Sequence, residues 1–408
     1  MVFNDERLYY DGSMKNYTKE QVSVLLKCCL IIGCSLGMIT NCMGIFFSPI
    51  SQSLEINTAQ VSIISTMISL LNGFMAPLFV RFVRKYKIHH LMTFGVLLNI
   101  TALTSMSFTR NIYLMYVFAA MAGMGNSFTS FVPATMILRN WFGERNGVPN
   151  GIMMSFTGVA GAILNPVISK IISSFGWSNG FRFMALLLVV ISLPCALSIR
   201  MKEEPEVVSV KKAITAVTVI PMKMYILLFI TVIFLYMNIG MNVHISSMGV
   251  EAGHTLQFSA TLVSCVMISN VVSKLILGAM ADHIHPIKAT AIVVSFSLIG
   301  TLILFFFRSN PAAAIVGAFL YGFVFAGNTV GVTMTTQAVA KERYSEVYSK
   351  LAIVNALSYS FTITFLGFLK DTSGSYSLPL ICILCTIILS IVLLLVLYRM
   401  KNTGKTAR

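Results

Sequence analysis

Apolar runs of about 20 residues recur along the whole chain, and this pattern limits the fold more than any other feature. An α-helix needs a run of this length to cross the hydrocarbon core of a bilayer. Hydrophobic residues make up 56% of the 408 residues and charged residues only 11%, whereas soluble domains carry about 25% charged residues. We therefore predict an all-α integral membrane protein with twelve transmembrane helices. The predicted spans are 22–50, 58–80, 90–109, 112–138, 148–173, 180–200, 222–247, 256–281, 288–307, 311–335, 347–369 and 376–398.

The distribution of Lys and Arg predicts the orientation. With the N-terminus inside, only five of the 29 Lys and Arg residues fall outside, namely Arg110, Lys170, Arg182, Arg308 and Lys370. Cytoplasmic loops are enriched in Lys and Arg, so we expect a multi-pass protein of the cell membrane with both termini cytoplasmic. This topology also accounts for the formal charge of +15. The basic clusters are short and separated by apolar runs, so we expect no nucleic-acid partner.

A polar interruption divides the chain into two halves of six spans. We predict a cytoplasmic tail (1–21), a first six-helix half (22–200), a central cytoplasmic linker (201–221), a second half (222–398) and a basic cytoplasmic tail (399–408). An internal repeat supports the division, because Gly125-Asn126 recurs 202 residues later as Gly327-Asn328. Repeated six-helix bundles with a site at their interface are a transporter architecture. The expected fold is two pseudo-symmetric six-helix bundles.

A lysine lies inside the eighth span, in the sequence NVVSKLILGAMAD that begins at Asn270. Asn270, Lys274 and Gly278 share one helix face, because steps of four residues drift by only about 40°. A charged side chain at the bilayer centre costs about 2.5 to 3.5 kcal/mol on insertion scales, and such residues usually face a bundle interior or a watery cavity. One interpretation is an anion-binding lysine in a transport cavity. The other is a lysine whose stem reaches the cytoplasmic head groups.

Three stretches resemble the major facilitator superfamily, and within it the oxalate/formate antiporter and monocarboxylate transporter branch. The first is GIFFSPISQSLEINTAQVSIIST, which starts at Gly44, and the second is WFGERNGVPNGI, which starts at Trp141. The third is the set of Asn270, Lys274, Gly278 and Asp282 in and after span eight. The resemblance covers nearly the whole chain. It implies the major facilitator fold and transport of a small organic anion by alternating access.

The chain departs from the family pattern at several positions. The loop after span two keeps Arg81 and Arg84 but has Val80 at the acidic position of the family signature. At the positions in spans one and eleven where the resemblance to this branch implies lysines, this chain has Asn41 and Asn355. The basic residue of span eight is Lys rather than the usual Arg, and Lys cannot clamp a carboxylate with two parallel hydrogen bonds. We therefore expect a singly charged or loosely held substrate, monocarboxylate-like rather than a dicarboxylate.

We predict two groups of functional residues. The predicted substrate-binding residues are Lys274, Asn270, Asn41, Asn355, His244 and Asn72. The predicted gating residues are Asp282, Gly278, Arg81, Arg84, Glu342 and Arg343. Every Asp and Glu falls in a tail, a loop or a helix end, so His244 is the one candidate for an intramembrane proton relay. We prefer exchange or facilitated diffusion of an anion, while proton cotransport through Lys274 stays open.

Other functions receive less support from the sequence. Cys382 and Cys385 form a CxxC in an apolar span without His or acidic neighbours, so we expect no metal site. We find no catalytic constellation, expect no enzyme activity and no cofactor, and expect a monomer whose partners are a small substrate and the lipid bilayer. The alternatives are a carrier for a neutral or cationic compound, including drug efflux, a nontransporting sensor on the same fold, and a membrane enzyme.

Overall fold

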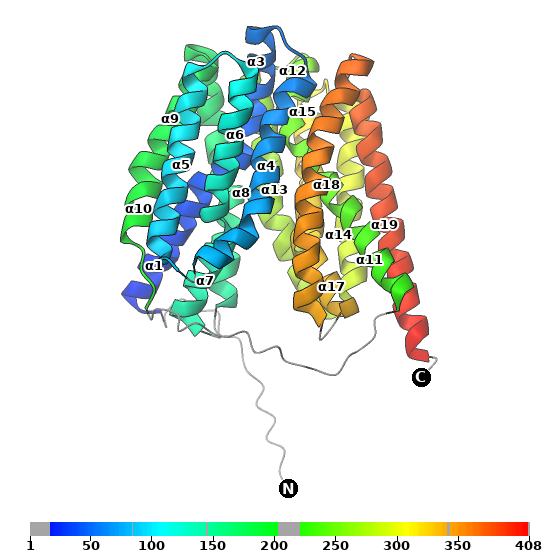
Figure 1. Cartoon of the computed structure of the whole chain (residues 1–408). Coiled ribbons are helices and arrows are strands. Elements are labelled where there is room, and N and C mark those ends of the chain that lie inside the picture. The colour runs from blue at the N-terminus through cyan, green and yellow to red at the C-terminus, as the bar shows by residue number, and fades with distance from the viewer. Residues whose placement is uncertain (1–16, 84, 144–145, 203–220, 341–342, 407–408) are drawn as a thin grey trace.

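The computed structural model describes residues 17–83, 85–143, 146–202, 221–340 and 343–406. Within these ranges the chain is helical and contains no β-strand. The helices stand side by side in two groups (Figure 1). We call α1 to α10 the first bundle and α11 to α19 the second bundle.

The first bundle contains residues 19–198. Several of its long helices are interrupted by short π-helical or 3₁₀ segments, which are named η. Its elements are α1 (Lys19–Ile32), η2 (Gly33–Gly37), α2 (Met38–Asn41), η3 (Met43–Phe46), α3 (Phe47–Leu54), α4 (Thr58–Phe82), α5 (Ile88–Phe108), α6 (Ile112–Phe128), α7 (Phe131–Phe142), α8 (Gly147–Phe175), α9 (Trp177–Leu187), η5 (Leu188–Ser192) and α10 (Leu193–Ser198).

The second bundle contains residues 222–406. Its last helix continues past the predicted end of span twelve at residue 398 and includes much of the predicted basic tail. Its elements are α11 (Met222–Met237), η6 (Asn238–His244), α12 (Ile245–Glu251), α13 (Leu256–His283), α14 (Pro286–Phe307), α15 (Pro311–Tyr321), α16 (Val324–Ala326), η7 (Gly327–Gly331), α17 (Val332–Ala340), α18 (Tyr344–Ser373) and α19 (Ser377–Thr406). The predicted linker, 201–221, lies almost entirely outside the described residues.

Eleven helical segments of the described ranges are long and apolar enough to cross a membrane. The predicted span at 112–138 is the one that differs, because α6 ends at Phe128 and α7 begins at Phe131. Thr129 lies between them with φ −120°, outside helical geometry. The α6–α7 pair therefore takes the place of a continuous fourth span, and the predicted all-helical, multi-pass architecture is confirmed.

Each bundle has its own hydrophobic core. One core is formed by buried residues between 24 and 199 and is joined by Val243, Ala260 and Ile363. The other is formed by buried residues between 228 and 397. The bundles meet along two seams, one where α4 packs on α18 and one where α8 packs on α13. We call the end of the molecule where α1 begins and α19 ends the terminal face, and the opposite end the distal face (Figure 1).

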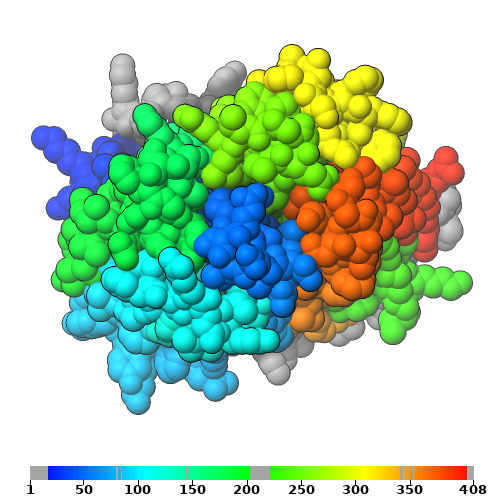
Figure 2. Space-filling model, turned by 90° about the horizontal axis from the view of Figure 1, so that it is seen from above, coloured from blue at the N-terminus to red at the C-terminus, as the bar shows by residue number. Residues whose placement is uncertain are grey.

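The bundles close together at the distal face. A Cβ atom built on Gly44, in η3, would overlap the backbone of Val243 in η6. The backbones of the two bundles therefore touch there without an intervening side chain. Viewed from above, residues of α3 fill the centre between α12 and α18 (Figure 2). Toward the terminal face the packing is more open, because Cβ atoms built on Gly151 of α8 and Gly278 of α13 would meet no atom within 4 Å.

Candidate functional site

The predicted lysine lies on α13 next to the α8–α13 seam. One turn earlier on the same helix, the side chains of Asn270 and Val271 lie against Gly158 of α8. Asn270 is only 2% exposed, and its Oδ1 atom has no hydrogen-bond partner. Lys274 is half-buried, and no described residue forms a hydrogen bond or ion pair with its ammonium. This part of the seam therefore combines an unpaired cation with a free amide oxygen.

Asn41 approaches the same stretch of α8 from the first bundle. It is 9% exposed, and its Nδ2 donates to the Thr157 carbonyl oxygen at 3.1 Å. A Cβ atom on Gly161 would lie 3.3 Å from the Asn41 Cβ and 2.8 Å from Met267 of α13. The structure thus brings Asn41 and the α13 residues to one short segment of α8.

Asn72 and Asn355 flank the other seam. Their neighbours Gly73 and Ala356 make the contact, because a Cβ atom built on Gly73 would overlap the Ala356 side chain. Both asparagines are half-buried. The structure therefore places Asn72 of α4 and Asn355 of α18 at one level of the interface, as a cavity-lining role requires.

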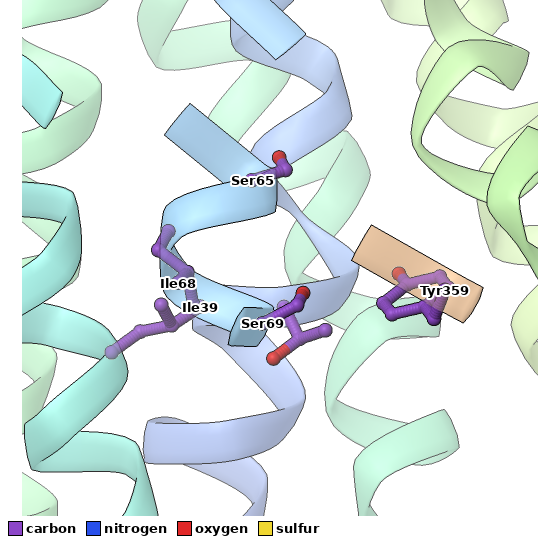
Figure 3. A pocket seen from close by; sticks show the side chains of 6 residues that line it. Ile39, Ser65, Ile68, Ser69 and Tyr359 are labelled. Atoms are coloured by element: carbon purple, nitrogen blue, oxygen red, sulfur yellow. The ribbon is translucent and has the colours of Figure 1, made fainter. Parts of the chain in front are cut away.

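A small pocket lies beside the α4–α18 seam. Its empty space is about 160 Å³, and its lining residues are Ile39, Thr40, Ser65, Ile68, Ser69 and Tyr359. Figure 3 shows that Ser65 and Ser69 come from α4, Ile39 from the neighbouring α2 and Tyr359 from α18. In this conformation the pocket has no room for even a water-sized sphere, whereas drug-sized ligand sites have roughly 300–1,000 Å³. It would have to widen as the bundles move before it could enclose most organic molecules.

The hydroxyl groups of this pocket were missed by the sequence analysis, although a signal for them exists. Ser65, Ser69 and Asn72 follow one another at spacings of four and three residues, which places them on one face of α4. Asn355 and Tyr359 are likewise four residues apart on α18. Examining serine, threonine and tyrosine together with asparagine would have revealed both polar faces.

His244 lies toward the distal face and is completely enclosed, with 0% exposure. Its Nε2 is 2.9 Å from the Ile363 carbonyl oxygen, and its Nδ1 is 3.3 Å from the Tyr376 hydroxyl. Its ring also packs edge-on against Phe47 of the first bundle. Substrate binding by His244 stays a prediction, and its contacts in this conformation are those of a packing residue.

The predicted gating residues that the structure describes lie near the terminal face, at or near the ends of their helices. Arg81 and Asp282 are exposed, and Gly278 borders open space. Arg343 forms a two-pronged ion pair with Glu346 of its own bundle, at 3.0 and 3.1 Å. The remaining two predicted gating residues, Arg84 and Glu342, lie outside the described residues. In this conformation none of the described gating residues has an ion pair with the opposite bundle.

Comparison with known proteins agrees with this architecture. Residues 29–363 match the model of the Major Facilitator Superfamily. Among curated relatives, "MFS-type transporter 1" of an Ophiocordyceps species is 24% identical over 71% of this chain and 65% of its own length. "Monocarboxylate transporter 3" of Gallus gallus is 27% identical over 41% of this chain and 30% of its own length. This chain thus spans less than two thirds of these two relatives. "Monocarboxylate transporter 12" of Xenopus laevis is 22% identical over 90% of this chain and 87% of its own length.

Solved structures share the fold. A bacterial homologue of the human lysosomal transporter Spinster, in an inward-facing and unoccupied conformation, superposes with a TM-score of 0.71. It is 12% identical, over 94% of this chain and 97% of its own. The nucleoside transporter NupG also gives 0.71, at 11% identity over 94% of this chain and 99% of its own. Because the family model covers most of the chain, and the two-bundle fold agrees with it, this multi-pass membrane protein belongs to the Major Facilitator Superfamily of transporters.

Proposed function

We propose that this transporter carries a small organic anion, monocarboxylate-like, by alternating access, with Lys274 as its charge partner. The observation that supports the proposal is the position of Lys274, half-buried at the seam between the bundles and without an ion pair to any described residue. The names of two relatives, monocarboxylate transporters 3 and 12, are consistent with this substrate class.

The physical reason is the cost of an unpaired charge. An ammonium removed from water loses hydration, and a bound carboxylate compensates for that loss by a charge-assisted hydrogen bond. The free amide oxygen of Asn270, one turn away, can accept a hydrogen bond from a hydroxyl of the substrate. A bound anion would therefore stabilise a state in which the bundles enclose Lys274, and binding free energy of this kind is what shifts a conformational equilibrium.

We further propose that the protein acts as a monomer in the cell membrane with both termini cytoplasmic. The terminal face is then the cytoplasmic face, and the conformation described here is open toward the cytoplasm. The open space around Gly151 and Gly278, where an added Cβ atom would meet nothing within 4 Å, supports the assignment of this face as the open one. In that orientation Asp282 and Arg81 lie where a cytoplasmic gate would have to form.

Counterflow into liposomes tests the proposal. Purified protein is reconstituted with an unlabelled carboxylate inside, and uptake of labelled small carboxylates is compared between the wild type and Lys274→Gln. We expect saturable exchange in the wild type and a loss of apparent affinity of about 30-fold or more in the variant. Lys274→Arg, which keeps the charge, should retain part of the exchange.

Lys170→Gln is the matched control. Lys170 is an exposed lysine of α8 on the distal side of the molecule, and its replacement should leave exchange unchanged. Wild-type exchange that survives Lys274→Gln would refute the role of Lys274. A failure to exchange any anion would refute the proposed substrate class.

A neutral, hydroxyl-bearing substrate is the second candidate, because the pocket itself is lined by uncharged groups. Thr40, Ser65, Ser69 and Tyr359 all present hydroxyls there, and the buried Ser65 hydroxyl has no partner. A labelled polyol or sugar panel in the same counterflow assay distinguishes the two. Uptake of a neutral compound that is insensitive to Lys274→Gln and reduced by Ser69→Ala would favour the second candidate.

A further inference from the structure

A carboxylate of the second bundle is bonded to the first turn of a helix in the first bundle. Asp371, near the end of α18, accepts hydrogen bonds from the backbone N–H groups of Thr58 at 3.1 Å and Ala59 at 2.6 Å. The Asp371 side chain is only 16% exposed. These two donors open α4 and lie at the distal face, where the bundles close together.

The chemistry of a helix start explains why this contact is strong. The first N–H groups of an α-helix have no partner within the helix, and the aligned peptide dipoles favour a negative charge at that end. Asp371 supplies both the acceptors and the charge. Lys370 lies beside it, and the Lys370 ammonium, 3.7 Å from the Asp371 carboxylate, provides a counter-charge.

Asp371 lies at the distal end of a continuous seam between α4 and α18. Further along, Gly367 packs on Ala59 so closely that a Cβ atom would lie 2.9 Å from the Ala59 Cα. The Thr66 hydroxyl then bonds the Ser360 carbonyl oxygen at 3.1 Å and lies 2.7 Å from the Thr364 hydroxyl. These inner contacts are neutral and short-ranged, so the charged contact at the end dominates the seam electrostatically.

The other seam uses neutral groups at the corresponding interface. There the Ser264 hydroxyl of α13 donates to the Ala162 carbonyl oxygen of α8 at 2.8 Å. Hydrogen bonds to a charged group contribute about 1.5–3 kcal/mol, against about 0.5–1.5 kcal/mol for neutral ones. Of these two contacts, the Asp371 bonds should therefore stabilise the closed distal face more.

We propose that Asp371 is the distal gate of the transporter, holding the distal face closed by capping α4 across the bundle interface. Opening the distal face must separate Asp371 from Thr58 and Ala59. The carboxylate and the helix start then become hydrated, and they pair again when the face closes. The inference depends on the bundles moving by alternating access, as proposed above, but not on the identity of the substrate.

The test is a distance measurement across the distal face. Spin labels are placed on the exposed positions Arg110 in the first bundle and Ser309 in the second, with the native cysteines replaced, in the full chain in lipid nanodiscs. Pulsed electron–electron double resonance then measures the distance distribution between the labels, which gives the populations of the closed and open conformations of the distal face. The test variant is Asp371→Asn, and the control is Glu55→Gln, which neutralises an exposed acid on the same face.

A second variant removes the donor rather than the acceptor. Thr58 is the first residue of α4, where proline is well tolerated because its missing N–H is not needed by the helix. The preceding Asn57 has φ −72° and ψ 154°, which suits a residue before proline. Thr58→Pro therefore deletes one of the two hydrogen bonds to Asp371 and leaves the helix start compatible with folding.

We expect Asp371→Asn to raise the ratio of open to closed populations by about tenfold or more, and Thr58→Pro to raise it less. The double variant should not exceed Asp371→Asn alone by much, because both act on one contact. Unchanged distances in both single variants, or an equal shift in Glu55→Gln, would overturn the proposal. Because no substrate is added, a failure of the organic-anion proposal leaves this result unaffected.

Discussion

A single methyl group at Gly44 should open the distal face. The Cβ of an alanine there would lie 2.7 Å from the carbonyl carbon of Val243 and 2.9 Å from its Cα, and would overlap its carbonyl oxygen. These are backbone atoms of the opposite bundle, so no side-chain rotation can relieve the overlap. Gly44→Ala is therefore expected to destabilise the closed distal face while leaving each bundle folded.

The size of the effect follows from the overlap. Ordinary contacts of a Cβ atom are 3.4–4 Å, so the two segments must separate by roughly 1 Å, and a close-packed interior cannot absorb this locally. Overpacking of this kind costs about 1–3 kcal/mol. Applied to the closed state alone, that cost raises the ratio of open to closed populations by about 5- to 150-fold.

The distance between labels at Arg110 and Ser309 measures this shift, and counterflow measures its consequence. We expect a larger open population and slower exchange, because every cycle must pass through the closed distal face. Gly151→Ala is the control for the distance measurement alone, since a Cβ atom there meets nothing within 4 Å and should not raise the open population of the distal face.

Two results would refute the reasoning about Gly44. One is an unchanged distance distribution in a folded Gly44→Ala protein, which would mean that the bundles accommodate the methyl group while closed. The other is a loss of thermal stability without any conformational shift, which would mean that Gly44 contributes to folding within its own bundle rather than to closure.

Three further predictions concern positions on either side of the site. Gly151 and Gly278 border open space here. Closure of the terminal face by an approach of α8 to α13 would fill this space, so Gly151→Ala and Gly278→Ala should both hinder closure. Distance measurements across the terminal face check this expectation. His244→Phe removes two buried hydrogen bonds and should lower the free energy of unfolding by about 1–3 kcal/mol, with substrate KM unchanged; a raised KM at unchanged stability would instead make His244 a binding residue. Asn41→Leu loses one interhelical bond, and thermal unfolding should show a cost of about 0.6 kcal/mol.

The apolar runs predicted most helix positions well. Span eight was expected at 256–281, and α13 is Leu256–His283; span nine was expected at 288–307, and α14 is Pro286–Phe307. The physical reason is that lipid-length hydrophobicity and local caps are both written in the sequence. Thr255, for example, accepts a hydrogen bond from the Phe258 N–H and so starts α13.

The break between α6 and α7 was not predicted, because hydrophobicity alone does not detect it. The chain there reads GNSFTS from Gly125, and Asn126 accepts a hydrogen bond from Asn99 of α5 at 3.1 Å. Small and polar residues weaken the helix locally, while a tertiary bond holds the segment in place. The polar composition was visible in the sequence, whereas the partner was not.

Asp371 shows the limit of sequence reasoning about the site. In the sequence it is an acidic residue at the end of a span, indistinguishable from a solvated charge. Its importance comes from α18 crossing α4 so that residues 313 positions apart meet, and no local periodicity encodes that crossing. The same holds for Asn72 and Asn355, which were predicted separately and are brought to one level only by the fold.

The position of Lys274 along its seam gives the strongest structural argument for its proposed role as the charge partner of the substrate. On the distal side of it, Gly158 of α8 touches Asn270 and Val271; on the terminal side, Gly278 borders open space. Lys274 thus lies where the seam changes from closed to open. When two rigid bundles rock against each other, residues at this transition move least and face each side of the membrane in turn. Asn270 and Asn72, each roughly four turns from the distal start of its helix, lie at a similar depth. A substrate held at this level would need no displacement of its own to pass from one side to the other, which is the geometrical requirement of alternating access.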